Sequence, residues 1–324
     1  MDEEIPSYSH AARQIGFVMR HHYLDRSEIK FIKKLIQDSY NTFGQLHHNK
    51  VFLNLGFWDK KIHDEYKELN FDFSKISEVQ DIYSQLLLYS LIRPLIKTQF
   101  FYKRLLEIGS GNGLGLKASS ELLKTDYALG VDLVNRLVVN SNRHFYDEDK
   151  VNYIQSDAEN LPLGNECFDI VINLESSHLY PRIEDFFSEV ERVLSLGGFF
   201  CYADHYFKNK DQSNKLEQFI KNNDKLKIIQ KVNITKQVQA SLYQRLIVNE
   251  EGFYRQALSI AGDDISQIIS ELPTIAAVCG LIFLPWWKIR FKNPALHYVA
   301  KYARKEKFWG RKYYFYYLVQ KVKK

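Results

Sequence analysis

The segment that most constrains this chain is LLEIGSGNGLG, residues 105–115. Its apolar run ends at Glu107, and glycines follow at positions 109, 111, 113 and 115. Glycine is needed where a backbone turns sharply off a strand and leaves bare main chain beside a ligand. The helix expected from Leu114 would point free amide groups and its positive dipole end at that ligand. The segment therefore predicts a strand, a ligand-binding turn and a helix.

The glycine spacing departs from the dinucleotide-binding fingerprint G-x-G-x-x-G, because its last position falls on Leu114 or Leu116 in the two registers. It fits E-x-G-x-G-x-G, which resembles the first motif of the class I S-adenosylmethionine-dependent methyltransferases. An ordinary glycine-rich turn is the alternative for this motif taken alone. The resemblance implies S-adenosylmethionine as cofactor and assigns four residues to its site: Glu107, Gly109, Gly111 and Gly113.

The rest of the chain fits an α/β fold. From Tyr102 to Asp204 short apolar runs alternate with helical stretches, which predicts right-handed crossovers and a parallel sheet. YYFYYLVQKV has the composition of a final strand. With the resemblance, we predict a Rossmann-like, seven-stranded methyltransferase sheet. Its expected parts are an N-terminal helical cap (1–100), a cofactor-binding core (101–234), a helical lid inserted between the last two strands (235–312), and a final strand with a basic tail (313–324).

Two further motifs support the resemblance. The second predicted strand ends in Asp132, 25 residues after Glu107, where an acid can accept hydrogen bonds from both ribose hydroxyls. DAENLPLGNECFD, residues 157–169, is similar to a signature of small-molecule methyltransferases. That similarity implies that Asp157 accepts from the adenine amino group and that the Ala158 amide meets the ring edge.

Ahead of the core, VFLNLGFWD at residues 51–59 resembles a segment of phthiotriol-type, tocopherol-type and fatty-acid O-methyltransferases. The resemblance implies packing beside the substrate. We therefore expect Phe57 and Trp58 near the acceptor, with Tyr40 as a further candidate. The alternative is that these aromatic side chains belong to the hydrophobic core.

The ends of the fourth and fifth predicted strands carry polar residues at the sheet edge where open α/β folds bind ligands. NLESSHLYP, residues 173–181, contains His178, and the fifth strand ends at Asp204. Similar sugar and small-molecule O-methyltransferases place a histidine and an aspartate at these positions. We assign His178 as the general base, because a histidine near neutrality can take a hydroxyl proton, and Asp204 as a second catalytic residue. A surface or capping histidine is the alternative. Asn173 is assigned to the cofactor and Glu175 to the acceptor side.

Several classes of site and partner are disfavoured. Three widely spaced cysteines argue against disulfides and zinc, no metal-ligand motif accompanies the site, and we predict no metal. The fourth strand lacks the N-P-P-[YF] end of enzymes that methylate flipped bases, which argues against nucleic acid. The N-terminus shows no export signal, so we expect a cytoplasmic protein.

Charge is unevenly distributed: residues 273–324 contain 12 Lys or Arg and one acid, Glu306. This basic region is either a solvated surface or a surface that attracts an anionic membrane or an acidic substrate. The apolar run LIFLPWWKI, residues 281–289, has the same two interpretations, lid core or interfacial segment.

The sequence as a whole predicts methyl transfer from S-adenosylmethionine to a hydroxyl or carboxyl oxygen of a small or lipidic acceptor, such as a lipid, polyketide or quinone-like molecule. C-methylation of an isoprenoid or quinone ring is the first alternative. A protein that binds the cofactor without turning it over is the second. The oligomeric state is left open.

Overall fold

The computed structural model describes residues 8–18, 25–46, 52–77, 79–98, 103–207, 215–249, 251, 280–285 and 312–323. Its α-helices are α1 Tyr8–Val18, α2 Arg26–Leu46, α3 Lys60–Glu68, α4 Ile82–Ile96, α5 Leu114–Leu123, α6 Asn135–Phe145, α7 Ile183–Val193, α8 Lys215–Lys221 and α9 Thr235–Tyr243. Its strands are β1 Arg104–Ile108, β2 Tyr127–Asp132, β3 Val151–Gln155, β4 Phe168–Leu174, β5 Leu194–Phe207, β6 Leu226–Asn233 and β7 Lys312–Lys321.

The strands form one seven-stranded sheet in the order β3-β2-β1-β4-β5-β7-β6, which confirms the predicted fold class. The neighbouring pairs from β3 to β5 are parallel. β7, the predicted final strand, runs antiparallel to both β5 and β6, with Tyr314 opposite His205. The central strands β1 and β4 are nearly continuous runs of buried apolar residues, as expected for strands covered on both faces.

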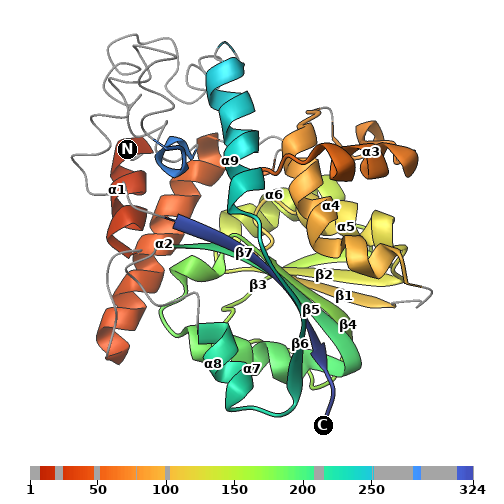
Figure 1. Cartoon of the computed structure of the whole chain (residues 1–324). Helices are drawn as coiled ribbons and strands as arrows, with labels where there is room; N and C mark the ends of the chain where they lie inside the picture. Colours follow the sequence, from red (N-terminus) through yellow and green to blue (C-terminus); the bar gives the residue numbers. More distant parts are fainter. Residues whose placement is uncertain are drawn as a thin grey trace.

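Helices cover both faces of the sheet (Figure 1). On one face α7 and α8 bury Phe186, Phe187 and Leu216 against the strands. On the other face α4 and α5 pack against β1 and β5, and α4 contributes a run of buried leucines. Asp81, the residue before α4, caps the helix, because its carboxylate accepts from the amides of Tyr83 and Ser84.

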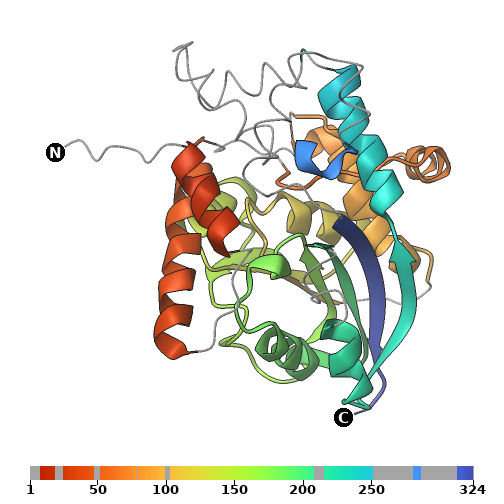
Figure 2. The same cartoon turned by 60° about the vertical axis from the view of Figure 1, so that its left-hand side comes forward.

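The N-terminal helices stand beside the sheet, where α1 and α2 lie against each other in both views (Figures 1 and 2). α2 also contacts α6. Ile32 and Ile36 of α2 form a small apolar core with Leu179, which follows β4 in the chain. This packing places α2 beside the segment that follows β4.

The predicted lid is described only in part. α9 packs against β7, a π-helical turn follows at Gln244–Val248, and a 3-10 turn lies at Leu281–Phe283. Residues 286–289 of the apolar run, which include Trp286 and Trp287, and most of the basic C-terminal region lie outside the described residues. The domain limits and the lid therefore stay predictions. Within the described ranges no helix combines the length and the apolar character needed to cross a membrane.

Candidate active site

A cavity of about 1090 Å³, its open mouth included, lies at the carboxyl ends of β1, β2 and β4. This is the switch point of the sheet, where open α/β folds bind ligands because the connections diverge there. The wall comes from the glycine turn, the ends of β2 and β4, and the loop after β3. Three residues of α2 also line it: Lys33, Ile36 and Tyr40.

The glycine turn has the conformation that its sequence predicts. Gly109, Gly111 and Gly113 have positive φ of 74°, 53° and 79°, a region that other residues enter with strain. A Cβ on Gly109 would lie 2.3 Å from Ser176 Oγ. The loop after β4 therefore packs against the backbone of Gly109 and leaves no room for a side chain there. The Gly111 amide donates to Asp132 Oδ2 at 2.9 Å, which ties the turn to β2.

Glu107 lies buried at the end of β1, 4% exposed, and lines the cavity. Burial and the nearby Asp132 carboxylate raise the pKa of Glu107 to about 8. Its Oε2 has no hydrogen-bond partner among the described residues. A buried carboxylate with an open oxygen suits a cationic ligand group, and the ammonium of S-adenosylmethionine is such a group.

Asp132 lies at the end of β2, where the sequence places it. Its Oδ1 accepts from the Val134 amide at 2.9 Å and its Oδ2 from the Gly111 amide. Burial raises the pKa of Asp132 to about 6 despite these bonds. A carboxylate has about four acceptor positions, so Asp132 can still accept from a ribose hydroxyl. The residues present thus fit the nucleoside part of the cofactor.

Asp157 and Ala158 line the cavity in the loop after β3, also as placed by sequence. Asp157 Oδ2 accepts from Lys33 Nζ at 2.5 Å, and the same ammonium pairs with Glu159. Lys33 comes from α2, more than a hundred residues earlier, and no motif pointed to it. The loop after β3 is therefore joined to the N-terminal helices through a partly exposed ion pair.

Asn173 occupies a different place from the other candidates. It is fully buried, and its Nδ2 donates to Ile108 O and Ser176 Oγ, both at 2.8 Å. These bonds tie the end of β4 to the end of β1. The structure places Asn173 beneath the cavity rather than among its lining residues. Its assignment to the cofactor thus has no contact with the cavity to support it.

Phe57 and Trp58 also lie away from the cavity wall. Phe57 is buried in the core, and the Trp58 ring packs against His63 and Tyr83 at centroid distances of 4.9 and 5.6 Å. Both belong to the apolar packing below α4, which is the alternative that the sequence left open. Phe52, Leu53 and Asn54 of the same segment line the cavity instead.

Glu175 lies where β4 ends, in a left-handed conformation with φ of 52°, and faces the cavity. Its two oxygens accept from the Leu55 amide at 3.1 and 3.0 Å, and Oε1 also accepts from Tyr314 OH at 2.8 Å. Burial raises its pKa to about 7. Glu175 thus joins the segment before the core and the last strand to the cavity.

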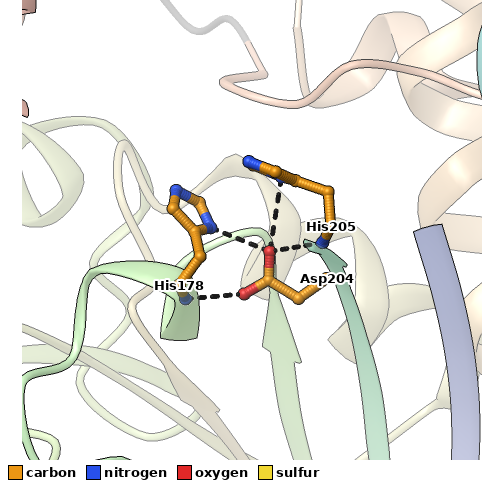
Figure 3. Close-up of side chains that lie close together, drawn as sticks. All are labelled: His178, Asp204 and His205. Atoms are coloured by element: carbon orange, nitrogen blue, oxygen red, sulfur yellow. Dashed lines mark hydrogen bonds and ion pairs between the residues drawn. The ribbon is translucent and has the colours of Figure 1, made fainter. Parts of the chain in front are cut away.

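His178 and Asp204 form a hydrogen-bonded pair (Figure 3). His178 Nδ1 lies 2.8 Å from Asp204 Oδ1, and the His178 amide donates to Asp204 Oδ2 at 2.9 Å. Burial favours the neutral form of each group, but their attraction outweighs it: the pKa of Asp204 is lowered to about 2 and that of His178 is raised. The structure therefore brings together the two predicted catalytic residues. Neither residue is among those that line the cavity, but Ser176 and Leu179, on either side of the pair Ser177–His178, do line it.

His205 completes the cluster of Figure 3. Its ring centroid lies 4.2 Å from that of His178, and its Nδ1 is 3.4 Å from Asp204 Oδ1. Burial and the His178 charge hold the pKa of His205 well below its usual value. Ligand atoms of His178, Asp204 and His205 lie within 4.8 Å of one another, as they would around a metal ion. Because hydrogen bonds fill the Asp204 oxygens, we interpret the cluster as hydrogen-bonded, and the absence of a metal stays a prediction.

Comparison with known proteins gives the family of the core. Residues 106–202 match the family described as "Methyltransferase domain". The chain is 41% identical over 102 residues to a fatty-acid O-methyltransferase of Mycolicibacterium smegmatis, which covers 32% of this chain and 37% of that protein. It is 40% identical over 108 residues to a phthiotriol/phenolphthiotriol dimycocerosates methyltransferase of Mycobacterium leprae, covering 33% and 40%. The matched segment thus spans less than half of these relatives.

Solved structures share the fold over most of the chain. The geranyl diphosphate C-methyltransferase of Streptomyces coelicolor has a TM-score of 0.54 at 15% identity, covering 90% of this chain and 98% of that one. The cyclase SpnF also has a TM-score of 0.54, at 12% identity, covering 98% and 96%. Identities this low show the fold alone.

The glycine turn, the acids at the ends of β1 and β2, the loop after β3 and the family match all agree with the resemblance stated from the motifs. Their agreement confirms that recognition, and with it S-adenosylmethionine as the cofactor of this domain class. The chain carries a methyltransferase domain of the class I, S-adenosylmethionine-dependent family.

Proposed function

We propose that this protein transfers a methyl group from S-adenosylmethionine to an oxygen atom of a lipid-like acceptor. The observation that carries the proposal is the His178–Asp204 pair at the carboxyl edge of the sheet, beside the cavity. An oxygen nucleophile gains from a base, whereas methyl transfer itself needs little beyond alignment. The pair supplies such a base.

The cofactor end of the cavity has a residue for each part of the ligand. Glu107 suits the ammonium, Asp132 the ribose hydroxyls, and Asp157 with Ala158 the adenine. The bound cofactor supplies a sulfonium methyl group that is already activated. The chain's own residues therefore need only align the acceptor, keep water out and move one proton.

The His178–Asp204 bond determines how His178 acts. Asp204 is ionised and can only accept, so His178 Nδ1 carries the proton and Nε2 keeps the lone pair when the ring is neutral. In that form Nε2 can take a proton from a hydroxyl group. When protonated, the ring is a buried cation and can hold an anionic carboxylate. A hydroxyl acceptor and a carboxylate acceptor therefore require opposite protonation states of His178.

The cavity walls and the relatives both support a lipid-like acceptor. Apolar side chains of Ile36, Phe52, Leu53 and Leu179 line the cavity, and Leu53 is 43% exposed at its surface. The relatives matched in the core are named for fatty-acid and dimycocerosate methylation. Together these support an acceptor with a long apolar part, a small molecule rather than nucleic acid.

The test uses purified protein, methyl-labelled cofactor and three acceptors: a long-chain fatty acid, a hydroxylated lipid and geranyl diphosphate. Mass spectrometry identifies the labelled product, and alkali separates a methyl ester from an ether or a C-methylated product. His178→Gln is compared with His144→Gln, which changes an exposed histidine on α6. We expect a labelled ester or ether, lost in the first variant and retained in the second.

The pH profile separates the two oxygen acceptors. Methylation of a hydroxyl should increase as pH rises through the His178 pKa, whereas methylation of a carboxylate should decrease. A product labelled at carbon, made equally well by His178→Gln, would replace the proposal by C-methylation. Binding of the cofactor with no labelled product from any of the three acceptors or from cell extract would indicate a protein without turnover.

A further inference from the structure

A line of buried hydroxyl groups leads to Asp204 from the α7–α8 side of the sheet. Ser177 Oγ lies 2.6 Å from Asp204 Oδ2 and 2.7 Å from Tyr202 OH, and Tyr202 OH bonds to Tyr206 OH. The three side chains are 2%, 1% and 3% exposed. Residues 202, 204 and 206 of β5 share one face because side chains alternate along a strand.

The ionised Asp204 fixes the direction of every bond in this line. A carboxylate only accepts, so Ser177 must donate its one hydroxyl hydrogen to Asp204. Tyr202 must then donate to Ser177, and Tyr206 to Tyr202. All three hydroxyls point their hydrogens toward the carboxylate, an arrangement in which each bond polarises the next.

Four donors fill the Asp204 carboxylate. Oδ2 receives Ser177 Oγ and the His178 amide, while Oδ1 receives His178 Nδ1 and the His205 amide at 2.7 Å. Two of the four are backbone amides of the loop and strand that hold the pair. The carboxylate therefore keeps its orientation if a side-chain donor is lost, and what changes is how strongly its charge acts on His178.

We propose that Ser177, Tyr202 and Tyr206 form a positioning relay that sets the basicity of His178 through Asp204. The relay withdraws negative charge from the carboxylate and so weakens its hold on the imidazolium proton. His178 is thereby kept a base that loses its proton nearer to neutrality. The proposal rests on the role proposed for His178, but the relay itself acts without an acceptor.

Other groups also act on His178 and must stay unchanged in a test. Asp204 and Glu175 raise the His178 pKa, and His205 stacks on its ring. The charge of Lys312 on β7 lowers the pKa of His205. The charge of Asp204 raises the pKa of Tyr40 on α2 and of Tyr314 on β7. Substitutions within the relay leave the side chains of Glu175, His205 and Lys312 in place, so that a change in the His178 pKa follows from the lost hydroxyl donor.

The test is an NMR titration of His178 in the cofactor-free full chain, with its signal identified among the ten histidines by comparison with His178→Gln. Ser177→Ala removes the donor nearest to Asp204, and we expect the His178 pKa to rise by about half a unit or more. Tyr202→Phe keeps the ring and should give a smaller rise. Ser177→Thr should restore the wild-type value. Tyr317→Phe is the control, since Tyr317 packs near Tyr202 but donates to Glu217.

The outcomes are separable from those of the proposed function, because the titration needs neither acceptor nor turnover. An unchanged His178 pKa in both Ser177→Ala and Tyr202→Phe, or a fall in either, overturns the relay. A rise in Tyr317→Phe equal to that in Tyr202→Phe also overturns it, because the effect would then be one of packing. Where turnover is measurable, the relay predicts that the pH midpoint of kcat shifts upward while KM for the cofactor is unchanged.

Discussion

Replacing Glu107 by Gln should make the cofactor-free protein more stable at high pH and weaken its binding of the cofactor. Burial raises the Glu107 pKa from the ordinary 4.5 to about 8. The folded state therefore holds a proton that the unfolded state has already lost, and stability falls as pH rises from about 4.5 to about 8. At about 1.36 kcal/mol per pKa unit, the full loss is at most about 5 kcal/mol.

Glutamine keeps the shape and never ionises, but a buried amide costs about 1 to 2 kcal/mol if poorly bonded. At pH 8 the free energy of unfolding of the variant should therefore exceed that of the wild type by about 3 kcal/mol, or several degrees in Tm for a chain of this size. At pH 5, where the wild-type carboxyl is protonated, the gain should vanish or change sign. The same variant should bind S-adenosylhomocysteine about 10-fold or more weakly, since it cannot pair with an ammonium.

Thermal denaturation between pH 5 and pH 8.5, with and without S-adenosylhomocysteine, measures both effects. Glu121→Gln is the matched control, because Glu121 is a partly exposed acid on α5 paired with Lys117. The reasoning would be refuted by a difference in Tm between wild type and Glu107→Gln that stays constant with pH. A constant difference would show that Glu107 is ionised throughout this pH range. Tighter cofactor binding by the variant would refute the ammonium assignment.

Three shorter predictions test other parts of the site. Asp132→Ala should weaken S-adenosylhomocysteine binding about 10-fold or more in calorimetry, and NAD should not shift the Tm of the wild type. His178→Ala should lower kcat by about 10² to 10⁴-fold with nearly unchanged cofactor affinity, a split that a merely structural role would not give. Cofactor release should become faster as salt is raised, because salt screens the partly exposed Lys33–Asp157 pair. That salt dependence should be lost in Lys33→Met, and its persistence there would contradict a role for the pair.

The parts of the molecule that the sequence could predict are those encoded within a few residues of one another. The E-x-G-x-G-x-G turn, with Asp132 at the next strand end, requires a strand, a tight turn and a helix in that order. The structure has these elements within a residue or two of the predicted limits. His178 and Asp204 were predicted from two separate strand ends, and parallel neighbours bring such ends together.

What escaped prediction depends on contacts between distant segments. In the sequence Lys33 is one of several cations on an amphipathic helix. Only the packing of Ile32 and Ile36 against the core brings it to Asp157. The strand-helix alternation predicted a parallel sheet but could not show that β7 inserts antiparallel between β5 and β6. The sequence could not show that the Asn173 amide joins the ends of β4 and β1, and its assignment to the cofactor stays a prediction.

The residues that form the site lie partly inside and partly outside the segment that is similar to the relatives. Residues 106–202, which match the methyltransferase family, contain most of the residues that suit the cofactor. Three contacts to this segment come from residues outside it. Lys33 forms an ion pair with Asp157, and the Leu55 amide and the Tyr314 hydroxyl both donate to Glu175. The matched segment thus contains most of the residues that suit the cofactor, whereas these contacts come from segments outside the match. We therefore expect exchange of residues 52–55 with a relative's segment to change acceptor preference before it changes cofactor affinity. A chimera that keeps its acceptor but loses S-adenosylhomocysteine binding would show that this segment serves the cofactor instead.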